Sequence, residues 1–410
     1  MNAPPGPGTA PTHSGASKRV ARLDALRGLA VIGIAWMNVY AFALPLQAYY
    51  NPVAFGMESA SDRFVWLASF VFVEDKFRTL FAMLFGAGCL ILLEKHAQHP
   101  LRAHTARMAV LFLIGLAHSI LLASNDVLRA YAMAGLALPM LYGLSSFALY
   151  CVSVGLIAVH VGAGIIVFGG ATLDYFAGLS GTDAALFAER NFGRDPGAIE
   201  YALRLGQESF ADRVMRRAVS IPAQLTSVAS SLPLNLAAMA LGMGLWRDAM
   251  LAGKWRVFMM QRLAAACALV ALPALFALGW WVSAEGFPGA LVGAGALILS
   301  APFDMLLGLA YALLVMALLR EDGRLTRALA AAGRLSLTNY IATSAAFACI
   351  FASWGLGFFG NVSRSQAFAL SFVPIIAMLV WSPLWLSRFP TGPIEWLWRF
   401  VSRRVAGTAT

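Results

Sequence analysis

One histidine and one aspartate have the types and the spacing of a general base and the carboxylate that orients it. His118 lies late in an apolar run, and Asp126 follows it in the polar turn 124–126, Ser-Asn-Asp. A turn that folds back toward the run would bring the carboxylate to the imidazole and make it a stronger base. The alternative is a core histidine whose hydrogen bonds are all satisfied within the protein, and both interpretations stay open.

A second polar group opens the first apolar run. The segment 22–28, Arg-Leu-Asp-Ala-Leu-Arg-Gly, begins with Arg22 and places Asp24 and Arg27 on one face of a helix. These charges either anchor the helix at a membrane surface or bind an anionic cofactor. Asn38 comes eleven residues after Arg27, which is about 16 Å along a helix. Its amide needs partners there from another helix or from a water-filled cavity.

Asp304 is the charge in the most apolar surroundings. It follows Pro302 inside a long apolar run, 289–319. The run and the proline predict a kinked helix, with Asp304 either on a cavity or paired with an arginine. Arg129 and Asn339 also lie near or within apolar runs. We take these three residues as candidates for contact with a substrate or a transported solute.

The sequence predicts no metal site. The cysteines form no Cys-x-x-Cys pair, and all four lie inside apolar runs: Cys89, Cys151, Cys267 and Cys349. They are most simply small core residues. Three histidines share one short basic loop, which is weak support for a metal: His96, His99 and His104.

The elements that carry these residues are membrane helices. Of the 410 residues, 60% are hydrophobic and 12% are charged, whereas soluble domains carry about 25% charged residues. Several runs are apolar on every side for more than about 18 residues, which is typical of helices in lipid. They lack the alternation of β-barrel strands. We therefore expect an all-α polytopic membrane protein in the lipid bilayer, a bundle of about ten transmembrane helices at 28–46, 77–93, 108–123, 130–146, 147–169, 221–245, 263–284, 289–319, 337–356 and 367–387.

The basic residues indicate an orientation. The net charge is +10, but the lysines and arginines lie mostly at the ends of apolar runs rather than in one stripe. This is the pattern of topology signals, and it argues against a nucleic-acid partner. An arrangement with both termini in the cytoplasm puts most of these residues on the cytoplasmic side.

Four segments complete the predicted organisation. Residues 1–17 should be a disordered leader. An amphipathic helix near 59–73 should lie on the membrane or dip into it, and a short interfacial helix should follow Pro393. The extracytoplasmic loop 171–220 should form short helices over one mouth of the bundle, as a spacer or as a gate. The remaining parts are an amino-terminal membrane half, 18–170, a carboxy-terminal membrane half, 221–404, and a tail, 405–410.

Both ends of the chain resemble one bacterial family. The opening, from Arg22 to Asn38, resembles the first helix of the YeiB-like membrane proteins. Residues 333–340, Gly-Arg-Leu-Ser-Leu-Thr-Asn-Tyr, and 392–399, Gly-Pro-Ile-Glu-Trp-Leu-Trp-Arg, resemble the carboxy-terminal domain of that family, a domain of unknown function. The resemblance covers nearly the whole chain. It implies a multi-pass protein of the bacterial inner (cytoplasmic) membrane.

The opening motif is also similar to that of two kinds of membrane acyltransferase. In the acyltransferase-3 type, the position eleven residues after the motif arginine is a functional histidine, and here it is Asn38. The heparan-glucosaminide acetyltransferase type has an asparagine there and a histidine shortly after the helix. This chain has no histidine between Asn38 and His96. His118 would therefore have to serve as the base.

Two hypotheses follow for the function. In the favoured one, Arg27 and neighbouring arginines hold the phosphates of a cytoplasmic acyl-CoA, and Asn38 lines a tunnel. His118 and Asp126 then act as base and orienter toward an extracytoplasmic or lipid-linked acceptor. In the alternative, the protein transports or exports a small solute or a lipid-linked substrate. His118, Asp126 and Asp304 would then be proton or solute sites.

Overall fold

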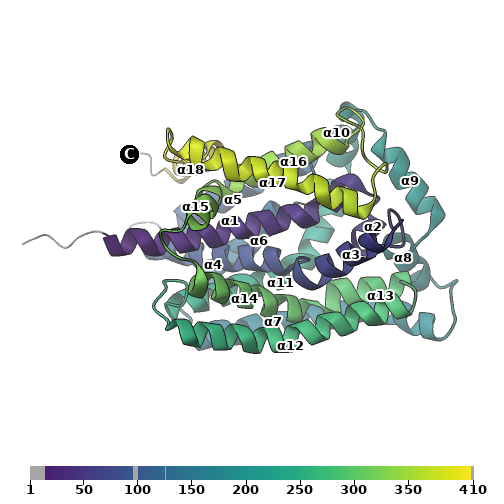
Figure 1. Cartoon of the computed structure of the whole chain (residues 1–410), viewed down its shortest axis with the longest axis horizontal. Coiled ribbons are helices and arrows are strands. Elements are labelled where there is room, and N and C mark those ends of the chain that lie inside the picture. Colours follow the sequence, from purple (N-terminus) through teal and green to yellow (C-terminus); the bar gives the residue numbers. More distant parts are fainter. Residues whose placement is uncertain (1–13, 96–99, 125, 408–410) are drawn as a thin grey trace, which may run out of the picture.

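The computed structural model describes residues 14–95, 100–124 and 126–407, and this part of the chain is helical with no strand (Figure 1). In chain order the elements are α1 (Ser14–Ala43), α2 (Gln47–Tyr50), α3 (Ala60–Phe72), α4 (Lys76–Lys95), α5 (Pro100–Leu121), α6 (Val127–Leu141), α7 (Ser146–Phe176), α8 (Asp183–Phe192), α9 (Pro196–Gly206), α10 (Phe210–Val219), α11 (Ile221–Arg247), α12 (Val257–Ala284), α13 (Gly289–Ala294), the π-helix η1 (Gly295–Leu299), α14 (Ala301–Leu318), α15 (Arg324–Arg334), α16 (Ser336–Phe351), α17 (Arg364–Leu386) and α18 (Pro393–Ala406).

The prediction of an all-α polytopic membrane protein is confirmed. Within the described residues, eight helical stretches are long and apolar enough to cross a membrane: Ala21–Ala43, Ala60–Glu94, Pro100–Leu121, Ser146–Phe176, Ile221–Arg247, Val257–Ala284, Ala301–Leu318 and Arg364–Leu386. Each overlaps one of the ten predicted spans. The other two predicted spans, 130–146 and 337–356, fall on α6 and α16, which have only 15 and 16 residues. Such helices are shorter than the roughly 20 residues needed to cross a bilayer alone.

The outermost helices expose apolar side chains. Ile166 on α7 is 84% exposed, and Leu269 on α12 is 77% exposed. Leu, Ile, Val and Phe at such positions would be costly in water, but they are the normal surface of a helix in hydrocarbon. The outer faces of α7 and α12 are therefore lipid-facing surfaces.

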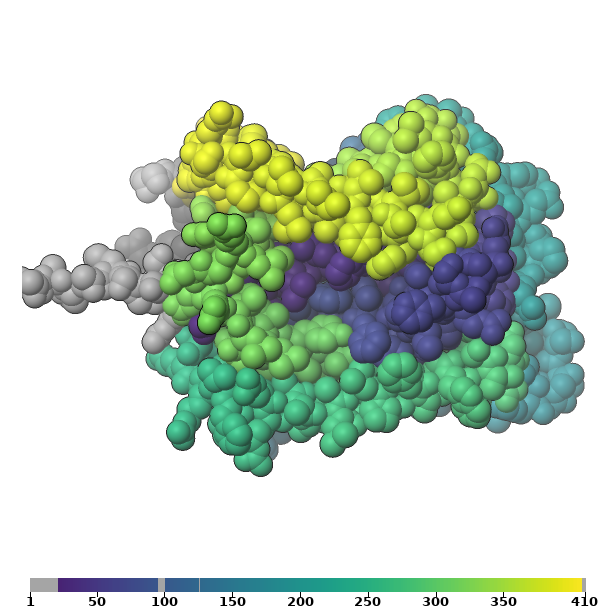
Figure 2. All heavy atoms as spheres, viewed as in Figure 1, coloured from purple at the N-terminus to yellow at the C-terminus, as the bar shows by residue number. Residues whose placement is uncertain are grey.

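Helix α1 is held against α15 by two glycines. A Cβ on Gly333 would overlap the carbonyl oxygen of Asp24, and a Cβ on Gly28 would overlap that of Leu329. Only glycine lets the two backbones come this close. Figure 2 shows the result from one side, where the carboxy-terminal segments in yellow and light green cover much of α1.

Two helices are interrupted inside the bundle. Helix α3 has 13 residues, and Val73–Asp75 separate it from α4. Helix α13 passes through the π-helix η1 into α14, so the run 289–319 is interrupted before Asp304. Figure 1 shows α3 and α13 in the half of the molecule away from the start of α1, and α4 and α14 in the half nearest to it.

The two ends of the bundle differ. The near end, as we call it, is where α1 begins and α18 lies, and the far end carries the short helices α8, α9 and α10 (Figure 1). Helix α18 exposes Trp396 and Leu397, as predicted for an interfacial helix. Helix α1 already includes Ser14–Ser17 of the predicted leader, and the rest of that segment, 1–13, lies outside the described residues.

Candidate functional site

The predicted base and its carboxylate lie side by side. His118 is in the last turn of α5, and Asp126 is the N-cap of α6, where its side chain accepts a hydrogen bond from the backbone N–H of Arg129 at 3.0 Å. Gly115, one turn before His118, permits this arrangement, because a Cβ there would stand 2.6 Å from Asp126 Oδ2. The turn between the two helices therefore folds back as the sequence indicated.

The carboxylate lies beside the imidazole, but neither ring nitrogen of His118 forms a hydrogen bond within the described residues. His118 Nδ1 is 3.0 Å from Asp126 Oδ1, and both side chains are almost completely buried. The contact lacks the geometry of a hydrogen bond, but a carboxylate this close to Nδ1 favours the tautomer with the proton on Nδ1, which leaves a lone pair on Nε2. His118 Nε2 is itself buried and has no hydrogen-bond partner among the described residues. It is the atom that could accept a proton from a substrate.

Two further side chains contact the pair, and a third contacts one of these two. The Tyr340 ring on α16 lies 5.0 Å from the His118 ring, and its hydroxyl is 3.5 Å from Asp126 Oδ1. Arg129 Nε is 3.6 Å from Asp126 Oδ2, and its Nη1 donates to Gln224 Oε1 on α11 at 3.0 Å. Arg129 places a positive charge beside the buried carboxyl group of Asp126. We call His118, Asp126, Arg129 and Tyr340 the histidine cluster.

A chain of contacts links the histidine cluster to the far end. Gln224, which accepts from Arg129, donates to the backbone carbonyl of Arg217 on α10. Arg217 Nε and Nη1 are buried without a hydrogen-bond partner in the described structure. Burial, together with the nearby charges of Arg213 and Arg216, lowers the pKa of Arg217 to about 10. A buried guanidinium group whose nitrogens have no hydrogen-bond partner is suited to bind an anionic group.

The opening residues form a separate group on α1. Arg27 Nη1 is 2.7 Å from Asp24 Oδ1, and Arg22 Nη2 is 3.5 Å from Glu321. The two arginines are therefore partly neutralised by acids of the chain itself. Asn38 is half-buried, and no hydrogen bond of its side chain occurs within the described residues. Its amide is thus free for a ligand or water.

Asp304 has a lysine partner rather than the arginine considered from the sequence. Lys76 Nζ, at the start of α4, is 2.6 Å from Asp304 Oδ1, and the two side chains are 1% and 2% exposed. Asn339 is fully engaged elsewhere, since its amide donates to Ala332 O and Ser382 Oγ and accepts from Trp381 Nε1. Of the three residues predicted to contact a substrate or solute, Arg129 lies in the histidine cluster, and Asp304 and Asn339 lie elsewhere.

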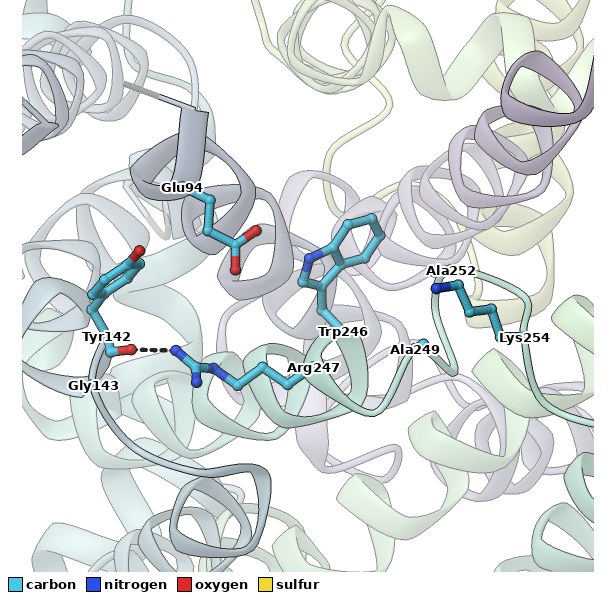
Figure 3. Close-up of a pocket in the computed structure, with 8 residues that line it drawn as sticks. All are labelled: Glu94, Tyr142, Gly143, Trp246, Arg247, Ala249, Ala252 and Lys254. Atoms are coloured by element: carbon cyan, nitrogen blue, oxygen red, sulfur yellow. Dashed lines mark hydrogen bonds between the residues drawn. The ribbon is translucent and has the colours of Figure 1, made fainter. Parts of the chain in front are cut away.

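A large hollow opens at the near end, and none of the residues discussed so far lines it. It has a volume of about 620 Å³ and is lined by Glu94, Tyr142, Gly143, Trp246, Arg247, Ala249, Ala252 and Lys254 (Figure 3). Arg247 donates to the backbone carbonyl of Tyr142, and Lys254 is exposed. Two cations and two aromatic rings suit an anionic, partly aromatic ligand, although Glu94 adds one negative charge.

Sequence reasoning missed several of these residues for identifiable reasons. Arg247 and Lys254 lie at the ends of apolar runs, where the sequence indicates only a role in membrane topology. Lys76 lies in the charged stretch 74–78, Glu-Asp-Lys-Phe-Arg, between apolar runs, and that stretch was the available signal for a buried charge cluster. The described residues hold no group of three or more His, Cys, Asp or Glu side chains arranged to bind a metal ion.

Comparison with known proteins identifies relatives along the whole chain. A family model described as a protein of unknown function (DUF418) matches residues 223–404. The uncharacterized protein YeiB of Escherichia coli (strain K12) is 30% identical over 400 residues, which cover 96% of this chain and 98% of YeiB. The uncharacterized protein YxaH of Bacillus subtilis (strain 168) is 25% identical over 408 residues, with 93% of this chain and 94% of YxaH covered. No solved structure matches significantly.

Proposed function

As a member of the YeiB-like family, the chain is a multi-pass membrane protein, and we propose that it is an acyltransferase. The donor would be a cytoplasmic acyl-CoA, and the acceptor a hydroxyl or amine on the other side of the bacterial inner membrane or on a lipid. Both termini would then lie in the cytoplasm, with the near end inside and the far end outside. The observation that carries the proposal is the buried His118–Asp126 pair with its free Nε2.

The donor side of the proposal rests on the near end. CoA carries phosphates and an adenine ring, and the hollow offers Arg247 and Lys254 beside Trp246 and Tyr142. These groups suit the donor better than Arg27, whose charge is already paired with Asp24. Arg27 Nη2 nevertheless lies close to Gly88 of α4, the helix whose last turn carries Glu94 at the hollow. The acyl chain would extend from there toward Asn38.

The chemistry assigned to His118 is acid–base catalysis. The imidazole Nε2 would remove the proton from the acceptor hydroxyl or amine as that atom attacks the thioester carbonyl. The C–S bond then breaks, and the protonated imidazole returns the proton to the departing CoA thiolate. Asp126 would hold the ring and stabilise its charged form. The products are an ester or amide and free CoA thiol, so that atoms and charge balance.

Access to His118 requires movement. Its side chain is 1% exposed, so an acceptor reaches Nε2 only if a covering element shifts. Helix α10 packs on α5 at the far end, and Gln224 connects it to the histidine cluster. We therefore assign α10 as the element that opens, with Arg217 as the first contact for an acceptor that carries an anionic group.

The test is consumption of radiolabelled acyl-CoA by the purified protein in proteoliposomes. Acetyl-CoA and long-chain acyl-CoA are supplied to the near side, and a panel of sugars, glycans and lipids is supplied to the far side. The proposal expects label to appear in a far-side or lipid product. Hydrolysis and transfer that never exceed those of empty liposomes across the panel would contradict it.

One observation favours transport as the second candidate. The interrupted helices α3–α4 and α13–α14 meet at the Lys76–Asp304 pair, and interrupted helices with buried charges are typical of transporters. Counterflow of a labelled solute in proteoliposomes, abolished by Asp304→Asn, would support this candidate. Acyl transfer that is unaffected by Asp304→Asn would count against it.

A further inference from the structure

The junction between α3 and α4 holds charges that acyl transfer does not use. Glu74, Asp75 and Lys76 follow one another where α3 has ended, and Lys76 reaches across to Asp304 at the start of α14. Immediately before α14, the chain takes the wider turns of the π-helix η1. Breaks and π-helical turns inside membrane helices often mark functional sites. The α3–α4 junction is therefore a second candidate site for a ligand.

The lysine at the centre of the junction is fully engaged. Its Nζ contacts Asp304 Oδ1 at 2.6 Å and donates to the backbone carbonyl of Phe70, and it lies 5.4 Å from the centre of the Phe70 ring. An ammonium in this position fills the space that a bound metal cation would need, and it repels a second cation nearby. The ligand of this junction is therefore not expected to be a metal ion.

Glu74 is the acid of the junction that has no partner. It is 5% exposed, and its Oε1 is buried without a hydrogen bond in the described part of the chain. No cation of the described residues lies within 4.0 Å of its carboxyl group, whereas Asp75 forms two bonds to Arg78 at 2.8 and 2.9 Å, and Asp304 has Lys76.

Arg364, whose charge also acts on Glu74, contacts other groups, although its Nε is buried without a hydrogen-bond partner in the described structure. Arg364 on α17 lies 4.4 Å from the centre of the Tyr40 ring and donates to the backbone carbonyl of Ala48. The titratable or charged neighbours of Glu74 are Tyr40, Tyr49, Tyr50, Asp75, Lys76, Asp304 and Arg364.

We propose that Glu74 is a proton-binding site, which holds a proton at neutral pH in this conformation and releases it when the α3–α4 junction opens to water. An ionised carboxylate without a partner is costly in a protein interior surrounded by lipid, and adding a proton removes that cost. The reaction is only the transfer of one proton between the carboxyl group and water. It does not depend on the proposed acyl transfer, because the histidine cluster lies on other helices.

Infrared spectroscopy of the purified full chain tests this assignment directly, in a detergent without ester or carboxyl groups, because the ester carbonyls of phospholipids absorb in the same region. Exposed carboxyl groups are ionised at neutral pH, so that the carbonyl stretch of a protonated carboxylic acid stands almost alone. We expect this band at pH 7 in the wild type and in Glu94→Gln, which alters an exposed glutamate at the other end of α4. We expect its loss in Glu74→Gln and a shifted band in Glu74→Asp. The shifted band keeps the test decisive if the glutamine variant does not fold.

Three results would overturn the assignment. A band that persists unchanged in Glu74→Gln would show that Glu74 is ionised. A band that disappears in Asp304→Asn but not in Glu74→Gln would assign the proton to Asp304. A melting temperature of the wild type that rises in sodium chloride relative to choline chloride, and does not rise in Glu74→Gln, would show that the junction binds a metal cation.

Discussion

Gly28 in the opening motif and Gly333 in the tail motif lie at one helix crossing, where a Cβ on Gly333 would come within 2.7 Å of the backbone nitrogen of Gly28. The same Cβ would overlap the carbonyl oxygen of Asp24. The two stretches that carry the family resemblance therefore bind α1 to α15. A main role of the two motifs is therefore to form this helix crossing, which fixes the positions of Asp24 and Arg27.

The crossing predicts a strong effect of one methyl group. Gly333→Ala should lower the stability of the folded protein by about 1–3 kcal/mol or more, because the obstructing atoms are backbone and cannot rotate away. Thermal unfolding in detergent measures the change. The matched control is Gly155→Ala on α7, where a Cβ would meet nothing within 4 Å. Equal melting temperatures for the two variants would contradict this account.

The pair Lys76–Asp304 should be needed mainly because each charge neutralises the other. Lys76→Met leaves Asp304 buried without a partner, which should cost about 3–5 kcal/mol. The double change Lys76→Met with Asp304→Leu should recover most of the loss, since no unpaired charge remains. The measurement is again thermal unfolding. A double variant less stable than Lys76→Met alone would contradict the prediction.

Glu395 on α18 should be essential for the start of α16. Its Oε1 accepts from the backbone N–H groups of Leu337 and Thr338 at 2.8 and 3.1 Å, and the side chain is buried. Glu395→Ala leaves those groups unsatisfied, which should cost about 1–3 kcal/mol. Glu94→Ala, at an exposed glutamate, is the control. Faster hydrogen exchange at Leu337 and Thr338 should accompany the loss of stability, and unchanged exchange would refute the capping role.

Asn38 should affect activity more than stability. Because its amide has no side-chain hydrogen bond within the described residues, Asn38→Ala should change stability by no more than about 1 kcal/mol. If Asn38 lines the path of the acyl chain, Asn38→Phe should block transfer of long acyl groups more than transfer of acetyl. The ratio of the two rates measures this effect. An unchanged ratio in a folded variant would remove Asn38 from the path.

The sequence was sufficient for features that depend on nearby residues. Apolar runs predicted the membrane helices, and the polar turn after α5 predicted that Asp126 returns to His118. The proline and the long run predicted an irregular helix near Asp304, and a π-helix interrupts the run there. Each of these features depends on local periodicity or on a short turn, which the order of residues determines directly.

Contacts between segments that are far apart in the chain could not be predicted from the sequence. Nothing near Asp304 indicates that its partner is Lys76, which comes from another part of the chain, and nothing near Asp126 indicates Tyr340 or Gln224. Asn339, a candidate for substrate contact, forms hydrogen bonds with Ala332, Trp381 and Ser382 instead. Such pairings depend on how the helices pack, and helices that are apolar on every side give little indication of which faces meet.

The most direct test of the acyltransferase proposal compares His118→Ala with His160→Ala in the acyl-CoA assay. His160 is a membrane histidine on α7 whose Nε2 contacts only the backbone carbonyl of Leu297, so that it controls for loss of an imidazole. The proposal predicts a fall in rate of about 100-fold or more for His118→Ala, with wild-type rates for His160→Ala and intact folding of both. A folded His118→Ala protein that transfers acyl groups at the wild-type rate would contradict it.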